Sequence, residues 1–123
     1  MIPRITLSNE AEELIETLKE KHGRLMFHQS GGCCDGSQPM CFEYGDFILG
    51  SSDVCLGKIM DCEFWMSSYQ FEYWKYTQLH IHVTKGRGSS FSLEIPMGVR
   101  FIIQSRLFTP DELNQLEPLR YID

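Results

Sequence analysis

The sequence predicts an α+β fold that is mostly β, with one amphipathic helix near its start and a short helix near its end. Two patterns indicate this class. Apolar side chains recur at helical spacing between residues 9 and 22, whereas later segments are short apolar runs separated by glycine, proline and polar turn residues. The length of 123 residues fits a single domain, 1–123, and leaves no room for two independent cores.

The helix predicted at Asn9–His22 has a start signal, an apolar face and a stop signal. Ser8 is a good N-cap, and glutamates follow in the first turn, where the helix dipole favours acidic groups. Gly23 is placed to end the helix. The apolar face consists of Ala11, Leu14, Ile15 and Leu18.

The other predicted elements are short. Residues 109–113 begin with threonine and proline and predict the short C-terminal helix. The aromatic-rich residues 69–76 are read as a helical turn or a wide loop. Strands are predicted at residues 4–7, 24–28, 40–44, 47–50, 54–58, 64–66, 78–84, 91–95 and 99–105.

Composition excludes several classes of function. Eleven basic residues stand against seventeen acidic ones, which gives a net charge of -6, so no basic face is available for nucleic acid. No apolar run is long enough to span a membrane, and the first residues lack the apolar core of a signal peptide. We therefore expect a cytoplasmic protein without nucleic-acid or membrane partners.

All cysteines lie between residues 33 and 62, at Cys33, Cys34, Cys41, Cys55 and Cys62. An odd count without a secretion signal predicts a reducing compartment rather than a disulfide framework. Cys55 and Cys62 have apolar surroundings in the sequence and are expected to be core thiols.

A long loop at residues 29–39 carries the candidate site. Its glycines, Gly31, Gly32 and Gly36, can present backbone N–H groups to sulfur or to an anion, and they are the candidate cofactor-binding residues. Thiolates suit soft or borderline metals such as iron (Fe), zinc (Zn) or copper (Cu). The candidate metal ligands are His28, Cys33, Cys34, Asp35 and Cys41.

Each ligand also has an alternative role. Adjacent cysteines rarely hold one ion together, so Cys41 is expected to pair with either Cys33 or Cys34; all three can instead be inert thiols around a tight glycine turn. His28 can be a nitrogen ligand, a base that lowers the pKa of a thiol, or a residue bonded to the loop backbone. Asp35 is also a typical turn residue.

A pair of histidines, His80 and His82, shares one face of the predicted strand at residues 78–84. That spacing can chelate a metal ion. It is equally typical of a half-exposed strand whose other face, with Leu79, Ile81 and Val83, packs on the core.

Two resemblances follow from the order of these parts. The strand and helix at residues 4–22, the Gly-Gly-Cys of residues 31–33 and the segment 86–96 resemble the HesB-like fold of A-type iron–sulfur carriers. This resemblance implies a small mixed sheet or pseudo-barrel. Only Cys33 matches the cluster cysteines of those carriers, because residues 99–108 contain no Cys-x-Cys pair, so their cluster ligation is not expected.

The second resemblance is more extensive. Residues 28–36, 39–41, 86–88 and 91–94 are similar to the signature of family number 779 among the domains of unknown function, which is mostly bacterial. Members are often encoded beside aldehyde dehydrogenases. The resemblance therefore implies an aldehyde dehydrogenase as a candidate partner.

Three functions are compatible with these observations. The first is a small accessory protein that binds a metal or cofactor at the Gly-Gly-Cys-Cys-Asp-Gly loop for a partner enzyme. A homodimer is compatible with this function. The second is a metal-free structural or regulatory interaction module that uses the aromatic segment 69–76. The third is a small thiol enzyme with Cys33 or Cys34 as nucleophile and His28 as base.

Overall fold

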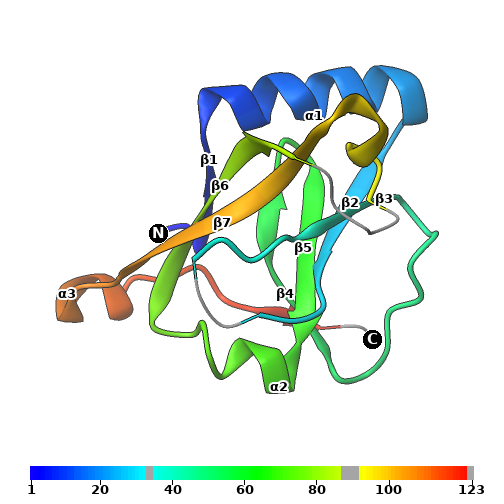
Figure 1. Cartoon of the computed structure of the whole chain (residues 1–123). Helices are drawn as coiled ribbons and strands as arrows, with labels where there is room; N and C mark the ends of the chain where they lie inside the picture. Colours follow the sequence, from blue (N-terminus) through cyan, green and yellow to red (C-terminus); the bar gives the residue numbers. More distant parts are fainter. Residues whose placement is uncertain (33–34, 87–91, 122–123) are drawn as a thin grey trace.

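The protein is described by a computed structural model for residues 1–32, 35–86 and 92–121. Its described strands form two sheets, a three-stranded one in the order β1-β6-β7 and a five-stranded one in the order β3-β2-β5-β4-β8 (Figure 1). The strands are β1 (Ile5–Leu7), β2 (Leu25–Gln29), β3 (Met40–Glu43), β4 (Asp53–Ile59), β5 (Cys62–Ser67), β6 (Thr77–Lys85), β7 (Val99–Leu107) and β8 (Arg120–Tyr121).

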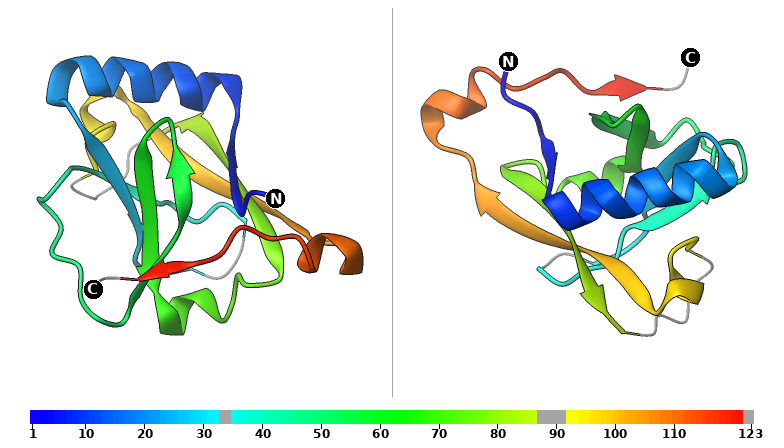
Figure 2. Two further views of the ribbon diagram at one scale, coloured as in Figure 1. Left: turned by 180° about the vertical axis from the view of Figure 1, so that it is seen from behind. Right: turned by 90° about the horizontal axis from the view of Figure 1, so that it is seen from above.

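The long helix α1 (Asn9–His22) has the predicted bounds and the predicted caps. The Ser8 hydroxyl accepts a hydrogen bond from the Ala11 backbone N–H over 3.1 Å, and the Gly23 N–H donates to the Lys19 carbonyl. The helix lies along one end of the two sheets, and α2 (Ser68–Phe71) lies at the opposite end (Figures 1 and 2). The 3₁₀ helix η1 (Ile95–Met97) precedes β7, and α3 (Pro110–Leu113) follows it.

The main core fills the space between the sheets and beneath α1. Phe27 on β2 lies at its centre, with its ring 5.1 Å from that of Phe101 and 6.0 Å from that of Phe64. Burying each such side chain contributes about 1.5–3 kcal/mol. The four predicted apolar residues of α1 all belong to this core.

A smaller cluster lies on the outer face of the five-stranded sheet. Phe47 and Leu49, in the connection from β3 to β4, pack on Met26, Cys55 and Trp65 there. The strand predicted at 47–50 is wrong. Ile48, between Phe47 and Leu49, is 90% exposed, so buried and exposed side chains alternate as they would in a strand. No described strand pairs with this backbone. The connection instead covers the sheet.

The strand predicted at 91–95 is also wrong over the part that is described. Residues 92–94 form a turn that leads into η1. Ser92 and Glu94 point inwards, where the Ser92 hydroxyl accepts a hydrogen bond from the Cys41 N–H and the Glu94 carboxylate accepts one from the Phe101 N–H. These side-chain bonds take the place of a strand ladder.

The predicted α+β class, mostly β, is confirmed. The remaining predicted strands are present with ends shifted by a few residues, whereas β8 was not anticipated. The strands described here do not close into a barrel. No helix in the described ranges is both long and apolar enough to cross a membrane.

Candidate functional site

The His28 side chain lies at the end of β2, on the outer face of the five-stranded sheet, and is 5% exposed. Its imidazole stacks on the ring of Phe47, with centroids 4.1 Å apart. Both ring nitrogens have polar partners: Nε2 lies 3.0 Å from Asp53 Oδ1, and Nδ1 lies 2.8 Å from the hydroxyl of Ser30. A buried imidazole thus joins a buried carboxylate to an exposed hydroxyl.

Asp53 is the site residue that the sequence analysis missed. It begins β4, two strands away from β2, and its second carboxylate oxygen accepts a hydrogen bond from the Gly50 N–H over 2.8 Å. The only local signal is an aspartate after a serine-rich turn, which is typical of any turn. Its meeting with His28 depends on the strand order, which the local pattern does not specify.

The structure does not bring His28 and Cys41 together. The β2–β3 register pairs Phe27 with Cys41 and His28 with Met40, and directly paired residues share a face. Phe27 and Cys41 belong to the core between the sheets, whereas His28 packs on the outer face. The sheet itself separates these two candidate ligands.

Cys41 has the environment of a core thiol. Its side chain is completely buried, and burial, with smaller contributions from Glu94 and Cys62, raises the pKa of its thiol far above the ordinary value. Cys55 and Cys62 are buried free cysteines, as predicted for core thiols, and burial raises the pKa of each. A thiol with a raised pKa is a poor ligand and a poor nucleophile at neutral pH.

The far end of the loop is fixed to β7. One Asp35 carboxylate oxygen accepts hydrogen bonds from the Ser105 N–H over 2.8 Å and from the Ser105 hydroxyl over 2.7 Å. Beside it, the Gly36 N–H donates to the Ile103 carbonyl, so this N–H is already satisfied within the fold. The structure thus gives Asp35 and Gly36 anchoring contacts at the edge of the three-stranded sheet.

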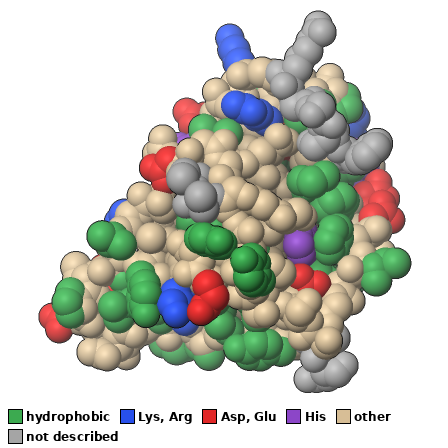
Figure 3. Space-filling model, turned by 60° about the horizontal axis from the view of Figure 1, so that its bottom comes forward, with side chains coloured by type: hydrophobic (Ala, Val, Ile, Leu, Met, Phe, Trp, Pro, Cys, Tyr) green, Lys and Arg blue, Asp and Glu red, His purple; other side chains and the backbone are tan. Residues whose placement is uncertain are grey.

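The near end of the loop contacts α2. The Gln70 side-chain amide donates a hydrogen bond to the Gly32 carbonyl, and Gly32, Tyr69, Gln70 and Tyr73 line a hollow of about 260 Å³. Tyr69 is 76% exposed and Tyr73 is 56% exposed. Figure 3 shows this end of the molecule, where hydrophobic side chains reach the surface in several places. The aromatic segment and the loop are therefore neighbours.

One aromatic residue of that segment is not on the surface. Trp74 is 2% exposed and belongs to the main core, so it cannot belong to an interaction surface, in contrast to the sequence-based interpretation of residues 69–76. The exposed aromatic rings of this segment are its tyrosines, Tyr69, Tyr73 and Tyr76.

The predicted metal ligands are therefore dispersed. Among the residues that the structure describes, no group of three or more histidine, cysteine, aspartate or glutamate side chains is arranged to hold a metal ion. Cys33 and Cys34 lie outside the described ranges. Of the predicted ligands within them, His28 is the one whose side chain sits at the base of the loop beside an exposed polar group.

Comparison with known proteins gives one match. The family model described as "Domain of unknown function (DUF779)" matches residues 14–107, which confirms the more extensive of the two sequence resemblances. No curated protein and no solved structure matches. The HesB-like scaffold therefore stays a prediction.

Proposed function

The chain belongs to the DUF779 family, and we propose that it is a small accessory protein that binds a soft or borderline metal ion at the loop that begins at Ser30. Iron, zinc and copper are the candidate ions, because cysteine sulfur and imidazole nitrogen suit these metals. His28 is the nitrogen ligand of this proposal, and Cys33 supplies sulfur, because two adjacent cysteines rarely hold one ion together.

The observation that carries the proposal is the pair formed by His28 and Asp53. Histidines that bind metals commonly hold a carboxylate on the ring nitrogen that does not face the metal, which fixes the ring and its tautomer. Asp53 Oδ1 does this at Nε2 over 3.0 Å, and the Gly50 N–H holds the other carboxylate oxygen. The second nitrogen, Nδ1, then faces the exposed Ser30 at the start of the cysteine loop.

The contacts around the loop narrow the ligand set. Cys41 is omitted because it lies on the other face of the sheet, and Asp35 is omitted because its carboxylate binds Ser105. An ion held by few protein ligands at an accessible loop keeps positions open for exchange, which suits delivery or sensing better than a purely structural role.

A partner that receives the ion must dock close to the loop. The exposed rings of Tyr69 and Tyr73 border the same hollow as Gly32, and tyrosine is enriched in protein interfaces. We propose this tyrosine surface as the docking face. An aldehyde dehydrogenase is the partner suggested by the family association, and a second copy of the chain is the alternative.

The test is the metal content of anaerobically purified, tag-free protein. We expect bound metal in the natural sequence and a loss of about one ion per chain in Cys33→Ser. Cys62→Ser, which changes a buried thiol of the main core on the other face of the sheet, is the control and should retain the metal. Metal-free protein after anaerobic reconstitution with each of the three ions would overturn the proposal.

A second function is favoured by one contact. The Ser30 hydroxyl lies 2.8 Å from His28 Nδ1, and Asp53 holds the opposite nitrogen, so serine, imidazole and carboxylate form a hydrogen-bonded chain. Such a chain can activate a hydroxyl for acyl transfer. A fluorophosphonate probe that labels the natural protein but not Ser30→Ala, in the absence of bound metal, would favour this function over metal binding.

A further inference from the structure

The two histidines of β6 form a compact pair on the outer face of the three-stranded sheet, whereas His28 belongs to the five-stranded sheet. Their ring centroids are 4.3 Å apart with the planes at 80°. Within the described residues, Nε2 of His82 is buried and has no hydrogen-bond partner. A buried ring nitrogen without a partner is an unsatisfied polar group, and it points to a ligand that the fold does not itself supply.

A hydrogen bond fixes the ring of the other histidine. His80 Nδ1 lies 2.6 Å from the Thr6 hydroxyl, which the parallel register of β1 and β6 places directly opposite it. A metal-bound histidine commonly uses its remaining ring N–H in such a bond, and the bond orients the ring.

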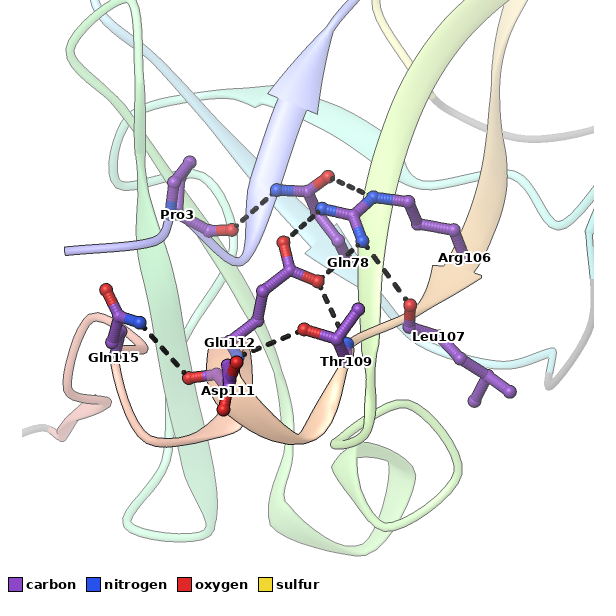
Figure 4. Close-up of polar contacts among 8 residues, drawn as sticks. All are labelled: Pro3, Gln78, Arg106, Leu107, Thr109, Asp111, Glu112 and Gln115. Atoms are coloured by element: carbon purple, nitrogen blue, oxygen red, sulfur yellow. Dashed lines mark hydrogen bonds and ion pairs between the residues drawn. The ribbon is translucent and has the colours of Figure 1, made fainter.

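Space for an ion lies next to His80. A cavity of about 430 Å³ is lined by His80 together with Thr6, Gln78, Gln104, Ser105 and Arg106. The positive charge of Arg106 is matched, because both of its terminal nitrogens contact the Glu112 carboxylate, at 2.9 and 2.8 Å (Figure 4). The arginine therefore does not present an unpaired charge against a cation.

We propose that His80 and His82 form a two-imidazole chelate for a divalent transition-metal ion, with water from the cavity completing its coordination. Imidazole ligands suit zinc, copper and nickel, and copper is expected to bind most tightly because it stands at the top of the divalent affinity series. This site uses no residue of the loop, so it stands or falls independently of the function proposed above.

The test is a zinc titration of the full-length protein, followed by nitrogen-detected NMR of the histidine rings. We expect saturable shifts of the His80 and His82 ring nitrogens. Either substitution, His80→Gln or His82→Gln, should weaken zinc binding at this site by at least about tenfold, since loss of a group that merely supports a ligand already costs that much. His22→Gln removes an imidazole on α1 that pairs with Glu43, and it should leave these shifts unchanged.

Repeating the titration in Cys33→Ser keeps the two sites distinguishable, since the histidine shifts should persist there. Ring nitrogens of His80 and His82 that stay unshifted while zinc binds elsewhere would overturn the proposal. Equal zinc affinity at this site in His82→Gln and in the natural protein, with both shown to be folded by thermal unfolding, would do the same.

Discussion

Asp53 and His28 come from strands that are not neighbours, yet their side chains meet 3.0 Å apart, both largely buried on the outer face of the five-stranded sheet. Asp53 also ties the end of the β3–β4 connection to β4 through the Gly50 N–H. One carboxylate therefore fixes both the imidazole and the segment that covers it.

Replacing this carboxylate tests both effects. Asp53→Asn should lower the free energy of unfolding by about 1–3 kcal/mol, because a buried donor loses its charged acceptor. It should also weaken metal binding at the loop by about 10–100-fold. Urea unfolding and metal titration measure the two effects. Asp46→Asn, an exposed turn residue, is the control, and equal effects from both variants would contradict this role for Asp53.

Because of the buried carboxyl of Glu94, we expect the free energy of unfolding to fall as the pH rises. This carboxyl is fully buried, and burial raises its pKa above the ordinary value. The unfolded chain therefore releases this proton at a lower pH than the folded protein does. Stability contributed by the protonated group is present at low pH and is lost as the pH rises from about 4.3 through the raised pKa.

The measurement is the free energy of unfolding between pH 4 and pH 8 for the natural protein and for Glu94→Gln. Relative to this variant, the natural protein should lose stability as the pH rises. Glu112→Gln is the control, because Arg106 lowers the pKa of Glu112 to about 2 and that stabilisation is lost only as the pH falls from about 4.3 towards 2, so its difference from the natural protein should stay nearly constant between pH 4 and pH 8. A pH-independent difference between the natural protein and Glu94→Gln would refute the assignment.

Substitutions in the aromatic segment 69–76 should separate effects on stability from effects on binding. Trp74→Ala should destabilise the protein by about 3–5 kcal/mol, because the indole is buried in the main core. Tyr69→Ala and Tyr73→Ala should each change stability by no more than about 0.5 kcal/mol, because these rings are largely exposed. Thermal unfolding measures these effects. Loss of partner binding or self-association in the tyrosine variants, measured by analytical ultracentrifugation, is expected if the tyrosine surface is the docking face.

Local patterns in the sequence predicted the elements of the fold more completely than their contacts. The helix α1 was predicted to the residue because its caps and apolar spacing are local signals. The segment 47–50 shows why alternation is insufficient: Phe47 and Leu49 pack inwards as a strand would, but pairing requires a neighbour that only the full topology supplies. The inward-pointing Glu94 likewise gave no local signal that it would bind the Phe101 N–H.

At the candidate site, too, local sequence features were predicted and contacts between distant residues were not. The composition of the glycine and cysteine loop identified the region, and His28 was found because it precedes that loop in the chain. Asp53 was missed because it is 25 residues away, and Cys41 was grouped with His28 because the sequence does not show on which face of the sheet each side chain lies.

Two adjacent glycines in the loop should respond differently to the same substitution. Gly32 has φ +86°, a conformation that costs a residue with a side chain about 1–3 kcal/mol. A Cβ there would also lie 2.8 Å from Ser37 Cβ and closer still to the Ser37 hydroxyl, whereas a Cβ on Gly31 meets nothing within 4 Å. Gly32→Ala should therefore lower stability and disturb the turn, and Gly31→Ala should do neither.

Urea unfolding of the two alanine variants measures the difference directly. Gly36→Ala separates the backbone strain from the steric clash. Gly36 has φ +92° but open space around its Cβ position, so its alanine variant reports the strain alone. We expect the order of destabilisation to be Gly32, then Gly36, then Gly31. If Gly32→Ala were as stable as Gly31→Ala, the close approach of Gly32 to Ser37 would not be what shapes the start of the loop.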